Sequence, residues 1–207
     1  MISRILLALY SFDCGGAPAG LAGALFFAAM NATDEPLRYP IGHPQLHDGP
    51  LPAAGRTALI QQLADLPGQL TAAARAVGGE GLQRPYRSGG WTGRQVIHHL
   101  ADSHLNCYTR YRLALTEEHP TIRPYDETAW AELPDVAATP ITVSLALLEA
   151  LHTRWVTLLR YLDEAQWQRT FYHPGMQRDF TLDQALALYA WHGQHHLAHV
   201  QLLLPPA

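Results

Sequence analysis

Cysteine is almost missing from this chain of 207 residues, in which Cys14 and Cys107 are the only two. Neither a disulfide framework nor a zinc knuckle built from several cysteines is therefore available to hold the fold. A strong charge of one sign is missing as well, because 14 basic residues stand against 18 acidic ones, for a formal net charge of -4. A nucleic-acid binder needs a basic stripe to neutralise phosphates, so we expect no nucleic-acid partner.

Long hydrophobic runs are also lacking, even in the first 30 residues, which are rich in small and apolar side chains. Asp13, the glycines that follow it and Pro18 interrupt this segment, whereas a membrane helix needs about 20 consecutive apolar residues. No clean signal-peptide cleavage site follows the apolar run. We therefore interpret residues 1–37 as an N-terminal extension, with Met30 as the true start, and expect no membrane partner and a cytoplasmic location.

The rest of the chain, residues 38–207, is long enough for one domain with a substantial core. Apolar positions recur every three or four residues in four segments, which is typical of amphipathic helices. These segments span about residues 55–77, 93–116, 140–162 and 182–204. The pattern predicts an all-α four-helix bundle, with Pro67 expected to kink the first helix.

Local signals mark where three of these helices begin. Thr92 with Gln95, and Thr181 with Gln184, have the spacing of a capping box, and Thr139 ahead of Pro140 predicts a cap for the third helix. The connection over about residues 120–140 is long for a bundle. Its aromatic residues predict a long ordered loop between the second and third helices.

Histidine is abundant where cysteine is not, with 12 in the chain. Three lie on the second helix and four on the last, namely His98, His99, His104, His192, His195, His196 and His199. Residues four apart on a helix share a face, so either His192 with His196 or His195 with His199 can offer two imidazoles to one ion. The apolar stripe of the last helix favours the first pair, but the face of the second pair is also apolar. Both registers therefore stay open.

A third ligand can come from the second helix, where His99 shares a face with Val96 and Ser103. Three neutral imidazoles suit zinc, nickel, copper or iron, and they leave coordination positions open for water or substrate. Asp102, three residues beyond His99, is a candidate to orient an imidazole or to act as a base. A solvated helix carboxylate explains Asp102 equally well.

Several segments of the chain carry a recognisable pattern over residues 39 to about 204. They are Tyr39–Gly42, Tyr86–Thr92, Arg94–His104, Arg123–Glu127, Trp130–Leu133, Phe171–Pro174 and Trp191–His199. Together they closely resemble the YfiT branch of the DinB-like superfamily of metal-dependent hydrolases. The resemblance implies a four-helix bundle whose metal ligands fall on His99, His192 and His196. It also implies a cytoplasmic homodimer with one zinc or nickel ion per chain, and it does not extend to residues 1–29.

These observations predict a metal-dependent hydrolase that activates a water for attack on an unidentified small substrate. Relatives in the wider superfamily imply an alternative, a thiol-dependent transferase or isomerase in which the metal activates a thiolate. A second alternative is a metal-binding stress-response protein without turnover. Its site would be closed by a fourth ligand such as His195 or Asp102.

Overall fold

The computed structural model describes residues 34–205 of the chain. The predicted start at Met30 lies outside the described residues, and the domain boundary near residue 38 stays a prediction. Residues 34–38 are helical, and an extended strap leads from them to the first long helix. Within residues 34–205, no single helix is long and apolar enough to cross a membrane; the segments Glu127–Ala138 and Ile141–Arg160 meet that test only as a pair bent by 117°.

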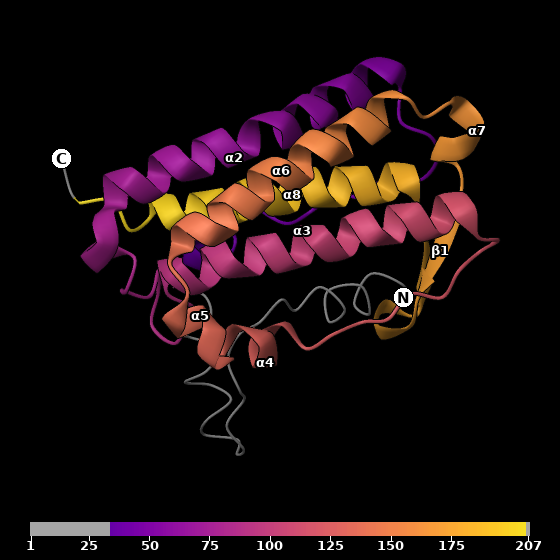
Figure 1. Ribbon diagram of the computed structural model, residues 1–207. Coiled ribbons are helices and arrows are strands. Elements are labelled where there is room, and N and C mark those ends of the chain that lie inside the picture. The colour runs from indigo at the N-terminus through magenta and orange to yellow at the C-terminus, as the bar shows by residue number, and fades with distance from the viewer. Residues whose placement is uncertain (1–33, 206–207) are drawn as a thin grey trace.

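Four long helices form a bundle, which confirms the predicted all-α architecture (Figure 1). They are α2 (Ala53–Gly81), α3 (Gly93–Thr116), α6 (Ile141–Arg160) and α8 (Leu182–Gln201). Helices α2 and α3 each pack against both α6 and α8, so α2 and α3 lie diagonally across the bundle. The parallel neighbours α3 and α6 run in one direction, and α2 and α8 run in the other (Figure 1). The chain must therefore return along the whole bundle between α3 and α6.

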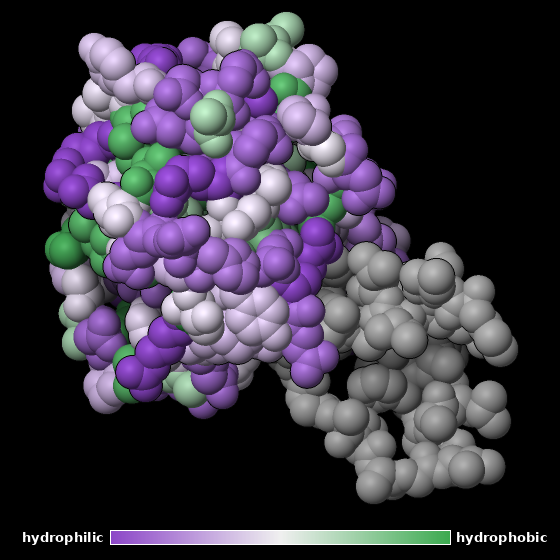
Figure 2. Space-filling view, turned by 90° about the vertical axis from the view of Figure 1, so that its right-hand side faces the viewer, coloured by the Kyte–Doolittle hydropathy of each residue, from purple (hydrophilic) through white to green (hydrophobic). Residues whose placement is uncertain are grey.

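That return explains the long connection, which is ordered as predicted and contains α4 (Glu127–Ala131) and α5 (Pro134–Ala138). At the other end of the bundle, α6 leads to α8 through α7 (Glu164–Trp167) and a hairpin. The hairpin consists of β1 (Thr170–His173), the short helix η2 (Pro174–Met176) and β2 (Arg178–Thr181), with Phe171 opposite Phe180 in antiparallel register. The surface at this end is mainly hydrophilic, with small separate hydrophobic areas (Figure 2).

The starts of α3 and α8 follow the predicted capping boxes. The Thr92 hydroxyl accepts from the Gln95 amide at 3.2 Å, and the Gln95 side chain accepts from the Thr92 amide at 2.9 Å. The predicted cap at Thr139 is wrong, because Thr139 ends α5 and its amide donates to the Asp135 carbonyl. In α2 the backbone stays helical through Pro67, and the break lies at Gly78, whose φ is 75°.

A layer of buried histidines separates two apolar clusters inside the bundle. One cluster, around Trp155 and Tyr111, takes residues 107–114 of α3 and 182–190 of α8. The other, around Leu100, takes residues 96–101 of α3, Leu197 and Val200 of α8, and Leu203 just beyond the end of α8. His192, His195 and His196 of α8 lie between these two stretches. Burial without water requires each of these polar rings to find a partner inside the protein.

A buried ion pair joins the start of α2 to the start of α8. The Arg56 guanidinium donates to both carboxylate oxygens of Asp183, at 2.7 and 2.9 Å, and to Glu164 at 2.6 Å. Asp183 also accepts from the Leu51 amide at 3.1 Å and from the Gln168 side chain at 2.9 Å. Both carboxylate oxygens of Asp183 therefore accept hydrogen bonds. A buried ion pair is tolerated only when its polar atoms are hydrogen-bonded in this way.

We predict that Asp183→Ala lowers the free energy of unfolding by about 3–5 kcal/mol, because it leaves a buried guanidinium without its main counter-charge. Glu164→Gln is the matched control, since the Glu164 side chain is 79% exposed and such a contact contributes only about 0–1 kcal/mol. Urea unfolding of both variants tests the difference. Equal losses in the two variants would contradict it.

Candidate metal centre

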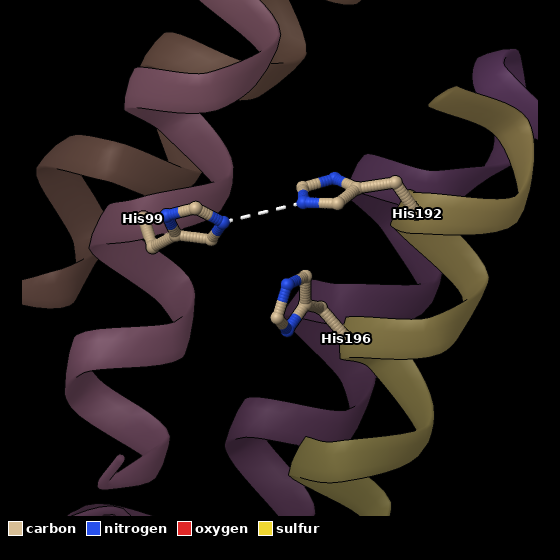
Figure 3. Close-up of side chains that lie close together, drawn as sticks. All are labelled: His99, His192 and His196. Atoms are coloured by element: carbon tan, nitrogen blue, oxygen red, sulfur yellow. Dashed lines mark hydrogen bonds between the residues drawn. The ribbon is translucent and has the colours of Figure 1, made fainter. Parts of the chain in front are cut away.

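Three histidines from two helices converge in the middle of the bundle. His99 of α3 points toward His192 and His196 of α8 (Figure 3). One ring nitrogen from each residue lies within 4.8 Å of the other two, and the Nε2 atoms of His99 and His192 are 3.2 Å apart. The three side chains are buried, with exposed fractions of 4%, 3% and 5%. The structure thus brings together the three ligands that the sequence predicted.

Burial keeps these imidazoles neutral. Desolvation lowers the pKa of His99 to about 3, and desolvation followed by the neighbouring imidazoles lowers the pKa values of His192 and His196 well below the ordinary value. A neutral imidazole has one protonated nitrogen and one lone pair, and the lone pair is what a divalent cation needs. The chemistry of this donor set therefore fits a transition metal.

A chain of hydrogen bonds fixes which nitrogen of His192 carries the lone pair. His152 Nδ1 lies 2.6 Å from the Leu63 carbonyl oxygen, which can only accept. His152 Nδ1–H therefore donates, and His152 Nε2 accepts from His104 Nδ1–H at 2.9 Å. His104 Nε2 in turn accepts from His192 Nδ1–H at 3.2 Å. The lone pair of His192 is thereby placed on Nε2, the atom directed at His99.

The Leu63 carbonyl is available to His152 because of Pro67. In an α-helix this oxygen would accept from the amide of the residue four positions later, but that residue is Pro67, which has no N–H. The proline therefore leaves an acceptor on α2 that faces α6. His152 donates to this carbonyl. The donor and acceptor roles are thereby fixed along the hydrogen bonds from α2 to α6, from α6 to α3 and from α3 to α8.

A second, shorter chain does the same for His196. His199 Nε2–H donates to the Arg38 carbonyl at 3.1 Å, so His199 Nδ1 is the acceptor for His196 Nδ1–H at 3.2 Å. The lone pair of His196 then lies on Nε2. Two of the three candidate ligands are thus oriented by chains that each end on a backbone carbonyl, as is common for metal-binding histidines.

These chains also bear on the competing register. His195, His196 and His199 form a second group with ring nitrogens within 4.8 Å of one another, and all three are buried. Burial therefore does not choose between the registers. Both nitrogens of His199 are used, however, one toward a carbonyl and one toward His196, whereas His195 stacks on Trp191 with ring centroids 4.4 Å apart. The hydrogen bonding favours His192 with His196.

Asp102, the other predicted site residue, has different neighbours. Its half-buried carboxyl interacts with the charge of Asp135 on α5, and within residues 34–205 it forms no hydrogen bond or ion pair with His99, His192 or His196. Its role as a base or orienting group stays a prediction that these contacts do not support.

Sequence reasoning passed over the residues that orient the ligands. Among the seven clustered histidines His104 has no predicted role, and His152 is not one of them. A signal existed for His152, because it is the one histidine on the inward stripe of its helix, beside Leu148, Leu151 and Trp155. Nothing in a pattern of spacings shows that Pro67 of another helix supplies its acceptor.

A small cavity adjoins the histidine centre. It measures about 40 Å³ and is lined by residues of α3, the start of α4, the hairpin and α8. Its polar lining includes Ser103, Arg110, Glu127, Tyr189 and His192. A hollow of about 950 Å³ lies on the outside between α2 and α6 and includes none of the three candidate ligands. The 40 Å³ cavity, which His192 lines, is therefore the candidate place for a substrate to reach the centre.

Comparison with known proteins matches most of this chain to one family. A model of the DinB superfamily matches residues 62–200, which include all three candidate ligands. YfiT of Bacillus subtilis, whose name assigns it provisionally to the metal-dependent hydrolases, is 49% identical over 164 residues, 79% of this chain and 92% of that protein. A Bacillus cereus protein with the same provisional name is 49% identical over 167 residues, 81% of this chain and 95% of that protein.

A solved structure shows the same fold. YfiT from Bacillus subtilis, described as a probable metal-dependent hydrolase with an unusual four-helix bundle topology, superposes with a TM-score of 0.79 at 48% identity. The match covers 81% of this chain and 95% of that one. The diagonal placement of α2 and α3 is thus shared with a relative of known structure.

We predict that His152→Leu weakens zinc binding by about 10–100-fold, because the hydrogen-bond direction that orients His192 is lost while all three ligands remain. His152→Gln should retain more affinity, since an amide can both donate to Leu63 and accept from His104. The measurement is competition with a chromogenic chelator. His98→Leu is the control, because His98 is also buried but is hydrogen-bonded to Ser144 instead. Equal zinc affinities in all variants would show that the hydrogen bonds from Leu63 to His192 do not affect metal binding.

We also predict that Asp102→Asn stabilises the protein more at high pH than at low pH. Burial, and then the charge of Asp135, raises the pKa of Asp102 to about 6 from 3.8, so the folded state holds this proton more tightly than the unfolded chain does. Ionisation of Asp102 therefore costs stability as the pH rises through this range, and the asparagine variant avoids that cost. Urea unfolding of the parent and the variant at about pH 5 and about pH 8 measures the difference in their free energies of unfolding. A difference that is the same at both pH values would contradict the prediction.

Proposed function

We propose that this chain, which belongs to the DinB superfamily, is a metal-dependent hydrolase whose ion is held by His99, His192 and His196. The observation that carries the proposal is the convergence of three neutral imidazoles, two of them with the lone pair fixed on Nε2 by carbonyl-ended chains. The provisional names of the relatives agree with a hydrolase.

One zinc or nickel ion per chain would supply a Lewis acid that makes water nucleophilic near neutral pH. Three protein ligands leave positions for that water and for the substrate. The chain itself orients the imidazoles and keeps bulk water away from them, because all three side chains are buried between two apolar clusters. Zinc or nickel, the homodimer and the cytoplasmic location are proposed from the family resemblance alone.

Glu127 is our candidate for moving the proton. Among the described residues that line the small cavity, it is the only carboxylate, and His192 lines the same cavity. Burial raises the pKa of Glu127. A general base works best when its pKa lies near the working pH, because it must both take a proton from water and return it to a leaving group. Asp102 does not line this cavity.

The proposal predicts about one zinc or nickel ion per folded chain, measured by plasma mass spectrometry after reconstitution. His192→Ala and His196→Ala should lose the ion, because each removes an oriented Nε2 donor, whereas His195→Ala should retain it. Retention in the first two with loss in the third would show that the other register holds the ion. No ion in the reconstituted parent would contradict the proposal.

Activity is tested on the zinc-loaded parent with a panel of chromogenic esters, amides and phosphoesters. We expect hydrolysis that His99→Ala abolishes and that Glu127→Gln lowers by about 10²–10⁴-fold. Cobalt substitution distinguishes the thiol alternative. A visible spectrum that changes on addition of a low-molecular-weight thiol, without hydrolysis of any substrate, would favour a thiol transferase over a hydrolase.

A further inference from the structure

Arg110 differs from the other buried arginines in residues 34–205. Three arginines are buried there, and Arg56 and Arg87 each face a carboxylate, of Asp183 and Asp34 respectively. Arg110 is only 8% exposed, yet it forms no ion pair with any carboxylate of the described residues. Its one side-chain hydrogen bond there goes from Nη1 to the Tyr189 hydroxyl at 3.3 Å. A guanidinium has five N–H donors, so most of its binding capacity is unused by the fold.

Burying a charge is costly unless it is paired and hydrogen-bonded, and Arg110 has only one side-chain hydrogen bond and no direct ion pair among the described residues. Arg110 cannot lower this cost by losing its proton, since a guanidinium stays charged in proteins. Glu127 in the same cavity is the carboxylate whose charge acts on Arg110, but the two form no direct ion pair, so the N–H donors of Arg110 remain available to a ligand. A negatively charged ligand that accepts from these donors would lower the cost of burial.

The position of Arg110 indicates where that ligand lies. Arg110 and His192 line the same cavity, so a molecule held by one is within reach of the other. On α3, Ser103 and Arg110 follow His99 by four and eleven residues, which places all three on one face of the helix. Their backbone positions span roughly 16 Å from His99 to Arg110 at 1.5 Å per residue, and the long arginine side chain shortens that gap.

The surroundings favour a single carboxylate over a phosphate. Arg110 is the only cationic side chain among the cavity's described lining residues, because burial lowers the pKa of His173 to about 4 and keeps it neutral. Glu127 lies in the same cavity and would repel a dianion more strongly than a ligand with one negative charge. A guanidinium also matches the planar, two-oxygen geometry of a carboxylate. The cavity of about 40 Å³ has room for about three waters, enough for a carboxylate group.

We propose that Arg110 binds a carboxylate of the substrate, at a distance along α3 from the candidate metal ligand His99. The substrate class is therefore small molecules that carry a carboxylate some distance from the bond to be cleaved. This inference rests on the proposed metal centre and extends it, since it names the residue that binds the part of the substrate distant from the metal. The Tyr189 hydroxyl accepts from Arg110 and is also hydrogen-bonded to Ser103 and Cys107, so it holds the guanidinium in place at the cavity wall.

A matched pair of ligands tests the assignment without requiring turnover. Succinic, glutaric and adipic monohydroxamates each carry a hydroxamate for the metal and a terminal carboxylate for Arg110. The neutral partners are the methyl-terminated hydroxamates of equal length. With the zinc-loaded protein, isothermal titration should show at least one acid bound about 10–100-fold more tightly than its neutral partner, the range for a charge-assisted bond. Arg110→Met should abolish this preference and leave the neutral ligand's affinity unchanged.

Stability measurements separate a binding role from a structural one. Replacing an unpaired buried charge by an apolar side chain of similar length should leave the melting temperature unchanged or raise it, so Arg110→Met should fold. Arg56→Met is the matched control and should lower it, because it leaves Asp183 unpaired. Equal binding of acid and neutral ligands to the parent would overturn the assignment while the metal centre stands. Binding of neither ligand by zinc-loaded protein would overturn both.

Discussion

A backbone carbonyl oxygen can only accept a hydrogen bond, and this constraint determines the chemistry of the buried histidine layer. Neutral imidazoles in contact must alternate donor and acceptor, so the direction of one bond sets the direction of the whole chain. Leu63 sets it for His152, His104 and His192. Arg38 sets it for His199 and His196. Both chains end with an Nε2 lone pair directed at one point between α3 and α8, which is what a metal ion requires.

The fold serves this arrangement at several levels. Pro67 removes the amide that would otherwise occupy the Leu63 carbonyl, so a residue usually considered harmful to a helix here supplies an acceptor. The Thr92 and Thr181 capping boxes fix the starts of α3 and α8, and therefore the rotation of the two helices that present the ligands. The buried Arg56–Asp183 pair then holds α2 against α8. Gly193 permits close packing there, since a Cβ would lie 2.5 Å from Leu66 Cδ2.

The local parts of this architecture could be predicted from the sequence, and the parts that depend on contacts between helices could not. Helical periodicity and capping boxes are properties of neighbouring residues, so the four helices and the start of α3 at Gly93 agree with expectation. The trio of His99, His192 and His196 followed from spacing together with family resemblance. The roles of Pro67, His152 and Arg110 depend on which helices pack together, and a single sequence does not contain that information in readable form. The prediction of a helix cap at Thr139 was wrong for a related reason, because Thr139 instead ends the short helix α5.

The most direct test of this account is a crystal structure of the zinc-loaded protein with anomalous difference density recorded at the zinc absorption edge. The account predicts one peak per chain, at about 2.0–2.1 Å from the Nε2 atoms of His99, His192 and His196, with His104 and His199 outside the coordination shell. A peak bound instead by His195 and His199, or bonded through Nδ1 of His192 or His196, would contradict it.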